Sequence, residues 1–181
     1  GHKLQGDLQA ALCVTNRVHH LSWVSMAGEA KRDYHASIFY QSPWYKEYRY
    51  IEDHFARVNT ALTRGKAKVR IGVIHPVESY WLHFGPREQT QMIRNEQEEN
   101  FANVTEWLLF SHLDFDYIAE SLLPGQFGGV EGRAFHVGEM AYDAVVVPGC
   151  ETLRSTTLEA LERFAAAGGR VILLGDAPRY I

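Results

Sequence analysis

The chain has 181 residues, of which 46% are apolar and 22% are charged, and its formal net charge is −4 at pH 7. These values are ordinary for a folded globular domain and exclude a disordered or fibrous chain. The 18 Lys and Arg residues are scattered along the chain, so we expect no nucleic-acid partner. The apolar runs are far shorter than the roughly 20 residues of a membrane helix, so we expect no membrane partner.

The two cysteines, Cys13 and Cys150, lie far apart and lack the spacing of a metal-binding pair. Two isolated thiols predict neither a disulfide framework nor a cysteine zinc site, and they are typical of a cytoplasmic protein. The chain starts with Gly1 instead of Met, which is typical of a processed or cloned start. We expect a cytoplasmic location. The compartment depends on the sequence at the native N-terminus.

The first third of the chain predicts a helix, a strand, a long loop and a second helix. Apolar residues at helical spacing run from residue 7 to about residue 17, and residues 21–25 are typical of a short buried strand. The irregular stretch at 26–43 predicts a long loop, a kind of segment that often carries function. Ser42-Pro43 is typical of a helix start, and apolar residues at steps of three and four continue to Gly65.

From residue 68 onward, the pattern alternates between strands and helices. It predicts a strand at 69–76, a loop with Tyr80, Trp81 and His83, a helix at 88–112, a strand at 115–118, a glycine-rich loop at 124–132, a small strand at 134–137, a strand at 142–149, a helix at 155–167 and a strand at 170–175. This alternation predicts an α/β fold with an open, mostly parallel, flavodoxin-like sheet and helices on both faces. Such a sheet normally has about five strands, so we expect a truncated sheet or one completed by the N-terminal strand.

Four segments together carry a resemblance to a known family. They are HLSWVSMAGEAKRDY (20–34), SPWY (42–45), FARVNTALTRG with the strand after it (55–76), and YDAVVVPG with the helix and strand after it (142–175). They resemble the last barrel strand, the closing barrel helix, the interdomain junction and the second domain of multidomain glycoside hydrolases such as the family 42 β-galactosidases. The resemblance implies that residues 1–64 are the end of a (β/α)8 barrel and that residues 66–181 form a class I glutamine amidotransferase-like domain.

The resemblance also implies a sugar site in the intact enzyme. The candidate substrate-binding residues are Glu29, Lys31, Arg32, Asp33 and Trp44, with His19 and His20 nearby. The charged loop would stand at the carboxyl end of a barrel strand, where barrel enzymes bind their substrates; a solvated loop and an ordinary packing Trp are the alternative. Only one barrel strand is present, so the carboxylate pair of glycoside hydrolysis cannot be assembled and we assign no catalytic residue.

A second candidate site follows the strand at 69–76. Open α/β sheets bind ligands beyond the carboxyl ends of their strands, and the residues at this position are His75, Glu78, Tyr80 and Trp81. We expect a vestigial or partner-facing crevice there. The histidines match no metal-ligand spacing, and no phosphate loop or dinucleotide motif occurs, so we expect neither a metal nor a cofactor.

Cys150 is the one candidate nucleophile of an amidotransferase-like site. Such a Cys stands on a sharp turn, usually within Gly-x-Cys-x-Gly, and a His later in the chain activates it. Glu151 and Thr152 follow Cys150, no His comes after it, and it follows the strand before the one that would carry the nucleophile. The pattern favours a structural Cys.

We therefore predict a noncatalytic structural or oligomerisation domain from a glycoside hydrolase of carbohydrate metabolism. Its expected partners are the rest of the parent enzyme, a second copy of the chain in a homo-oligomer, and carbohydrate in the intact protein. Two alternatives stay open. One is an autonomous amidotransferase-like hydrolase that uses Cys150, and the other is a carbohydrate-binding module that uses Trp44, Trp81 and nearby tyrosines.

Overall fold

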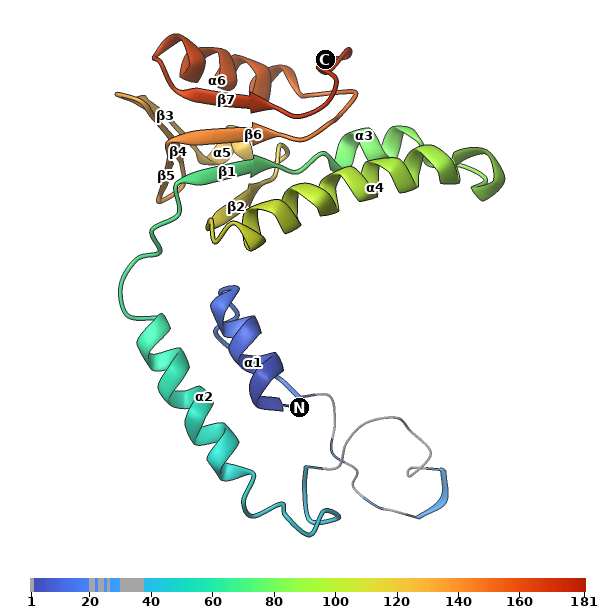
Figure 1. Ribbon diagram of the computed structural model, residues 1–181, viewed down its shortest axis with the longest axis vertical. Helices are drawn as coiled ribbons and strands as arrows, with labels where there is room; N and C mark the ends of the chain where they lie inside the picture. Colours follow the sequence, from blue (N-terminus) through green and yellow to red (C-terminus); the bar gives the residue numbers. More distant parts are fainter. Residues whose placement is uncertain (1, 20–21, 23–24, 26, 30–37) are drawn as a thin grey trace. The chain divides into compact units, whose positions relative to one another are not determined.

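A computed structural model describes residues 2–19, 22, 25, 27–29 and 38–181. The chain divides into two compact units, residues 1–67 and residues 68–181. The elements of both units are labelled in Figure 1. Among the described residues, no helix is both long enough and apolar enough to cross a membrane.

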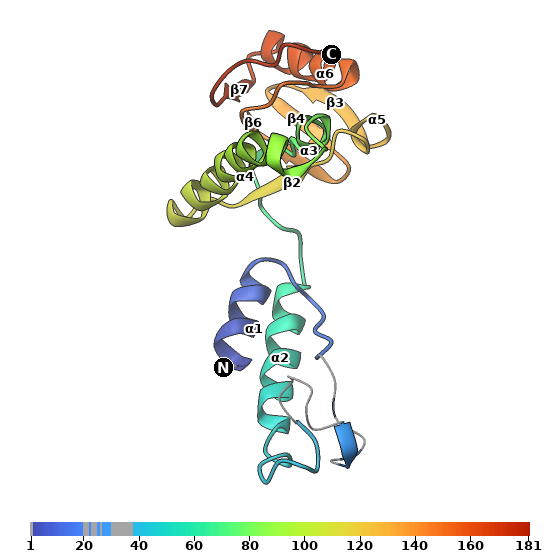
Figure 2. The same cartoon turned by 90° about the vertical axis from the view of Figure 1, so that its right-hand side faces the viewer.

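The first unit is built on two helices, α1 (His2–Ala11) and α2 (Arg49–Leu62), which lie side by side (Figure 2). Gly6 of α1 and Phe55 of α2 are both buried where the two helices pack together. A Cβ at Gly6 would stand only 2.1 Å from Cζ of Phe55. Gly6 therefore lets the Phe55 ring pack directly against the backbone of α1.

The sequence predictions for the extents of both helices of the first unit are wrong. The first helix ends at Ala11, well before residue 17, because the chain turns at Cys13, which has a left-handed φ of 69°. Its expected apolar face is exposed at Leu8 and Leu12, since α1 pairs through small residues instead.

The second helix begins at Arg49 and not at Ser42-Pro43. Residues 43–48 form successive tight turns, in which the N–H of Tyr45 donates to the carbonyl oxygen of Ser42 at 3.2 Å. Residues 21, 23 and 24 of the expected strand at 21–25, and residues 26 and 30–37 of the expected loop at 26–43, lie outside the described residues.

The second unit centres on a parallel sheet of four strands in the order β2-β1-β6-β7. The strands are β1 (Ile71–Ile74), β2 (Phe115–Ile118), β6 (Ala144–Val147) and β7 (Arg170–Leu173). In register, Ile71 pairs with both Phe115 and Ala144, and Ala144 pairs with Arg170. All four strands come from residues 68–181, and the sheet has the open, flavodoxin-like α/β arrangement that the sequence predicts.

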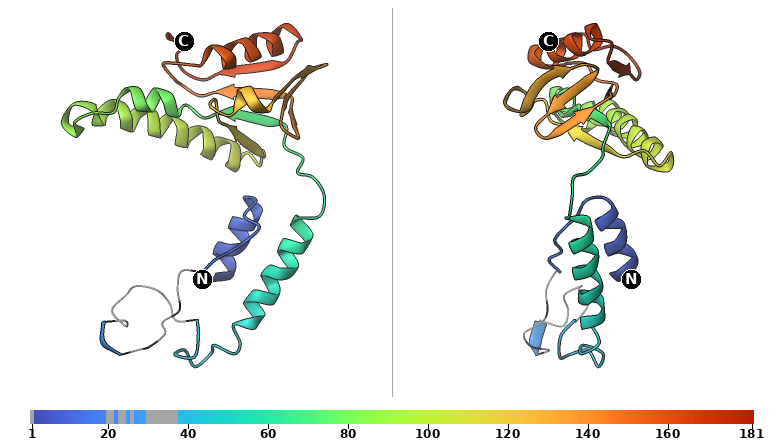
Figure 3. Two further views of the ribbon diagram at one scale, coloured as in Figure 1. Left: turned by 180° about the vertical axis from the view of Figure 1, so that it is seen from behind. Right: turned by 90° about the vertical axis from the view of Figure 1, so that its left-hand side faces the viewer.

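Helices cover both faces of this sheet (Figure 3). On one face, Val104 of α4 (Arg87–Phe110) packs against Val73 and Val146. On the other face, Leu161 and Phe164 of α6 (Ser155–Ala166) pack with residues of β1 and β6. β6 is consequently buried from both sides, which explains its run of β-branched residues.

A small antiparallel sheet covers the same face as α6. Its strands, in the order β3-β4-β5, are β3 (Phe127–Glu131), β4 (Ala134–Val137) and β5 (Met140–Tyr142). The Phe135 ring of β4 is fully buried, and its centroid lies 5.3 Å from that of Phe164. The three strands thus close the larger of the two core clusters.

Three predictions for the second unit need correction. The glycine-rich loop at 124–132 is the short helix α5 (Leu123–Gln126) followed by β3, where Gly129 adopts a φ of 99° at a bulge in the strand. The expected strand at 142–149 is the end of β5 and the whole of β6, separated by a bend at Asp143. The expected loop at Tyr80 contains the helix α3 (Val77–Leu82), which is too short to show a helical period.

Candidate functional site

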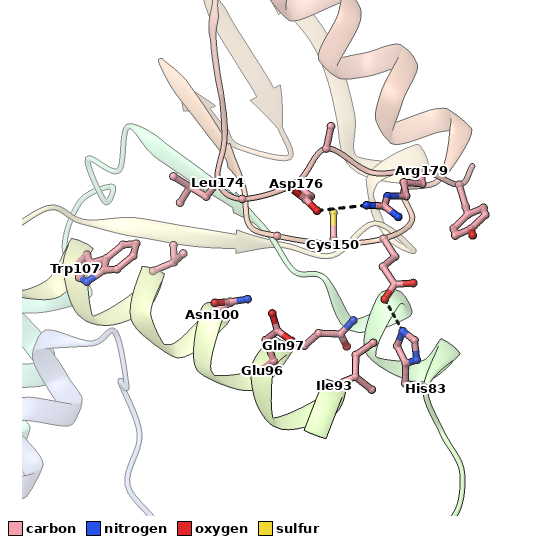
Figure 4. A pocket seen from close by; sticks show the side chains of 16 residues that line it. His83, Ile93, Glu96, Gln97, Asn100, Trp107, Cys150, Leu174, Asp176 and Arg179 are labelled. Carbon is pink, nitrogen blue, oxygen red and sulfur yellow. Dashed lines mark hydrogen bonds and ion pairs between the residues drawn. The ribbon is translucent and has the colours of Figure 1, made fainter. Parts of the chain in front are cut away.

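A crevice of about 740 Å³ lies between α4 and the segments that follow β6 and β7 (Figure 4). Open α/β sheets bind ligands in this position, beyond the carboxyl ends of the strands. Six residues of α4 form one wall: Ile93, Glu96, Gln97, Asn100, Val104 and Trp107. The opposite wall is formed by residues 149–151 and by the segment 174–180.

The segment 174–180 is held in place by backbone hydrogen bonds to the turn after β6. The N–H groups of Arg179 and Tyr180 both donate to the carbonyl oxygen of Glu151, at 2.8 and 3.0 Å. In return, the N–H of Leu153 donates to the carbonyl oxygen of Tyr180 at 3.1 Å. These bonds fix the shape of the second wall.

Two glycines bring backbone to the surface of the crevice. A Cβ at Gly149 would stand 3.4 Å from the carbonyl oxygen of Leu174 and 4.0 Å from Nδ2 of Asn100. Gly175 has a φ of 77°, and a Cβ there would meet the Cα of Gly149 at 3.7 Å. The lack of side chains at both positions therefore lets the segments after β6 and β7 pack closely against each other.

Acidic and basic side chains both line the crevice. His83 Nε2 lies 2.6 Å from Oε1 of Glu151, and an Nη of Arg179 lies 3.5 Å from a carboxylate oxygen of Asp176. Glu96 adds a third carboxylate on the α4 wall. The Arg179 guanidinium of the crevice is thus paired with a carboxylate, and the three carboxylates of the lining outnumber it.

Behind the crevice, hydrogen bonds tie the turns after β1, β2 and β6 together. The buried Ser79 Oγ accepts from the N–H groups of Glu151 and Thr152, at 3.0 and 3.1 Å. The buried carboxylate of Glu120 accepts from the N–H of Arg154 at 2.9 Å. The Arg154 guanidinium in turn pairs with Glu78 at 2.6 Å.

The four residues predicted for a crevice after the first strand lie in different surroundings. Glu78 takes part in the ion pair with Arg154. Trp81 is largely exposed and lines neither the crevice nor the small cavity beside His75. His75 and Tyr80 line a separate, smaller cavity of about 170 Å³. There the His75 ring packs 5.2 Å from the ring of Phe101.

The residues predicted to bind substrate belong to the first unit. Glu29 is exposed, and Trp44 is partly exposed, with its ring 6.4 Å from that of Tyr48. The phenol oxygen of Tyr48 lies 2.6 Å from Nε2 of His19. Lys31, Arg32, Asp33 and His20 lie outside the described residues.

Sequence reasoning missed the α4 wall of the crevice. The residues at positions 93, 97, 100, 104 and 107 alternate in steps of four and three and so share one helical face. This face includes Val104, which packs against the sheet, together with two amides and a Trp. Polar residues within the stripe that faces the sheet are the signal that would have marked this wall.

Cys150 is buried at the edge of the crevice, with 7% of its surface exposed. Burial, and secondarily the negative charge of Glu120, raises the pKa of the Cys150 thiol to about 12. The thiol is the protonated form at neutral pH, and only the thiolate is a strong nucleophile. The turn after β7, where an amidotransferase-like site would hold its nucleophile, consists of Gly175, Asp176 and Ala177.

A metal site is not formed by the side chains that the structure describes. Within that part of the chain, no group of three or more His, Cys, Asp or Glu residues could hold a metal ion.

Comparison with known proteins gives one distant structural likeness. No family model and no curated protein matches the chain. Among solved structures, the chain is similar to a β-galactosidase from Bifidobacterium adolescentis, with a TM-score of 0.41 and 21% sequence identity. The similarity covers 60% of this chain and 42% of that chain, so the chain spans less than half of the length of that protein.

Proposed function

We propose that residues 68–181 form a noncatalytic structural domain of a glycoside hydrolase and that this domain mediates association between subunits. The observation that carries the noncatalytic part is the state of Cys150, the one thiol of this unit. It is buried, its pKa is raised to about 12, and the nearby imidazole of His83 bonds to Glu151. A glutamine-hydrolysing site needs an accessible thiolate with its own base.

The glycoside hydrolase context is supported by the sequence. The four segments at 20–34, 42–45, 55–76 and 142–175 resemble, in order, the last barrel strand, the closing barrel helix, the interdomain junction and the second domain of such enzymes. In this proposal the catalytic carboxylates belong to the barrel of the parent enzyme, and residues 68–181 supply a surface for assembly.

The association surface that we propose lies on α3, the loop that follows it and the start of α4. Three large apolar side chains there are mostly exposed: Trp81 at 62%, Phe84 at 85% and Met92 at 85%. Gathered exposed apolar residues of this size are typical of a surface that another protein covers. We define this set, together with Leu82, as the α3–α4 surface.

Analytical ultracentrifugation of the full chain over a range of concentrations tests the assembly part. We expect reversible self-association that Phe84→Ser weakens by tenfold or more, since about 1.4 kcal/mol corresponds to that factor. The matched control is Phe110→Ser, because Phe110 is similarly exposed, at 79%, but lies at the other end of α4. A wild-type chain that stays monomeric, or equal effects of the two substitutions, would contradict the proposal.

Activity assays test the noncatalytic part. We expect the purified chain to hydrolyse neither a chromogenic β-galactoside nor glutamine. Turnover of glutamine that Cys150→Ser abolishes would instead establish an autonomous amidotransferase-like hydrolase.

A further inference from the structure

The crevice beside α4 has no role in the proposed assembly, yet it is built as a binding site. Its volume of about 740 Å³ lies within the range of small-molecule sites. Its second wall is fixed by the hydrogen bonds from Arg179 and Tyr180 to Glu151. A ligand would therefore enter a cavity whose shape already exists, which lowers the ordering that binding requires.

One buried polar atom in this wall lacks a protein partner. Oε1 of Gln97 is inaccessible to solvent and accepts no hydrogen bond in the part of the chain that the structure describes. Gln97 borders both the large crevice and the small cavity beside His75. Buried acceptors are nearly always bonded, and a turn of the Gln97 side chain toward the crevice would let this oxygen accept a hydrogen bond from a ligand hydroxyl group.

The charges of the crevice decide which kind of ligand fits. The Arg179 guanidinium is already paired with Asp176, and the His83 imidazole is hydrogen-bonded to Glu151. The lining is acidic overall, which disfavours phosphates and carboxylates. Carboxylates and side-chain amides such as Asn100 instead accept and donate hydrogen bonds to neutral hydroxyl groups.

An aromatic ring completes the lining. Trp107 lies one turn beyond Val104 on the same face of α4 and is 60% exposed. An exposed indole in a polar cavity provides an apolar face, against which the C–H face of a sugar ring packs.

We propose that this crevice binds a neutral saccharide, with Trp107 packing on the sugar ring and with Gln97 and Asn100 hydrogen-bonding its hydroxyl groups. The site is separate from the α3–α4 surface. The inference does not depend on subunit association, because it rests on the lining of the crevice alone.

Isothermal titration calorimetry of the full chain with lactose and with galactose tests the inference, with inorganic phosphate as the anionic probe. We expect saturable binding of at least one sugar in the millimolar range or tighter, and none of phosphate. Trp107→Ala and Asn100→Ala should each weaken sugar binding by tenfold or more. Phe110→Ala is the matched control, because Phe110 is an aromatic residue of the same helix, is 79% exposed and does not line the crevice.

The Gln97→Leu variant distinguishes the loss of a ligand contact from a loss of folding. It removes the unpartnered oxygen, so the variant should melt at the wild-type temperature or above it while its sugar affinity falls. The inference is overturned if neither sugar binds saturably, if phosphate binds in their place, or if Phe110→Ala weakens sugar binding as much as Trp107→Ala does. Ultracentrifugation of the same samples reports association independently of these results.

Discussion

Ser79 Oγ accepts a hydrogen bond of 3.0 Å from the backbone N–H of Glu151, which lies 72 residues further along the chain. A second bond, from the N–H of Thr152 at 3.1 Å, reaches the same oxygen. One buried hydroxyl thus joins the start of α3 to the turn that follows β6 and supports the rear of the crevice.

Replacing Ser79 with Ala should destabilise the second unit. Two backbone N–H groups would lose their acceptor, and leaving a buried donor unsatisfied costs about 1–3 kcal/mol. Urea denaturation followed by circular dichroism measures the change. Ser121→Ala is the control, because Ser121 is exposed; equal midpoints for the Ser79→Ala variant and the wild-type chain would show that the two bonds contribute nothing to stability.

Cys150 should resist alkylation while the protein is folded. Its thiol is buried and its pKa is raised to about 12, so almost no thiolate exists near pH 8. Cys13 is exposed and serves as the internal control. Treatment with iodoacetamide and peptide mass spectrometry should show modification at Cys13 only, and modification at both cysteines in denaturant. Rapid labelling of Cys150 in the folded chain would favour a nucleophilic role.

The second unit should lose stability in alkaline solution. Burial raises the pKa of the Cys150 thiol from 9.0 to about 12, and burial with the Asp116 carboxylate raises the pKa of Tyr142. Folding therefore favours the protonated forms, so their contribution is complete below pH 9.0 and declines as the pH rises toward about 12.

Urea midpoints measured between pH 8 and pH 11, at about half-unit intervals, follow this decline. Cys150→Ala removes one of the two groups, so its midpoint should fall less steeply with pH than that of the wild-type chain. Parallel pH profiles for the two proteins would show that Cys150 is not desolvated as the structure indicates.

Gly6→Ala should separate α1 from α2, although alanine favours a helix over glycine by up to about 1 kcal/mol. The added Cβ would stand 2.1 Å from Cζ of Phe55, so the buried ring would have to move away from α1. Amide hydrogen exchange in residues 2–11 and 49–62 should become faster. Gln5→Ala, on the exposed side of α1, should leave exchange unchanged or slower, and protection retained in Gly6→Ala would contradict the predicted clash.

Long periodic segments were predictable from the sequence because burial imposes their pattern. The run Val145-Val146-Val147 indicates a strand buried on both faces, and α4 and α6 extend over enough turns for their apolar stripes to be visible. Shorter elements were not predictable. α3 has six residues, and β3 carries two glycines whose purpose is visible only against the partner strand β4.

The sequence by itself therefore determined the fold class and the absence of a nucleophile motif around Cys150, since both depend on residues that are neighbours in the chain. The tertiary structure alone decided where a ligand could bind. Gln97 and Asn100 face Gly149 and Gly175 only after the strands pair and α4 packs on the sheet. Local sequence patterns do not encode contacts between residues about 50 to 80 positions apart, because the packing of the whole sheet sets those distances.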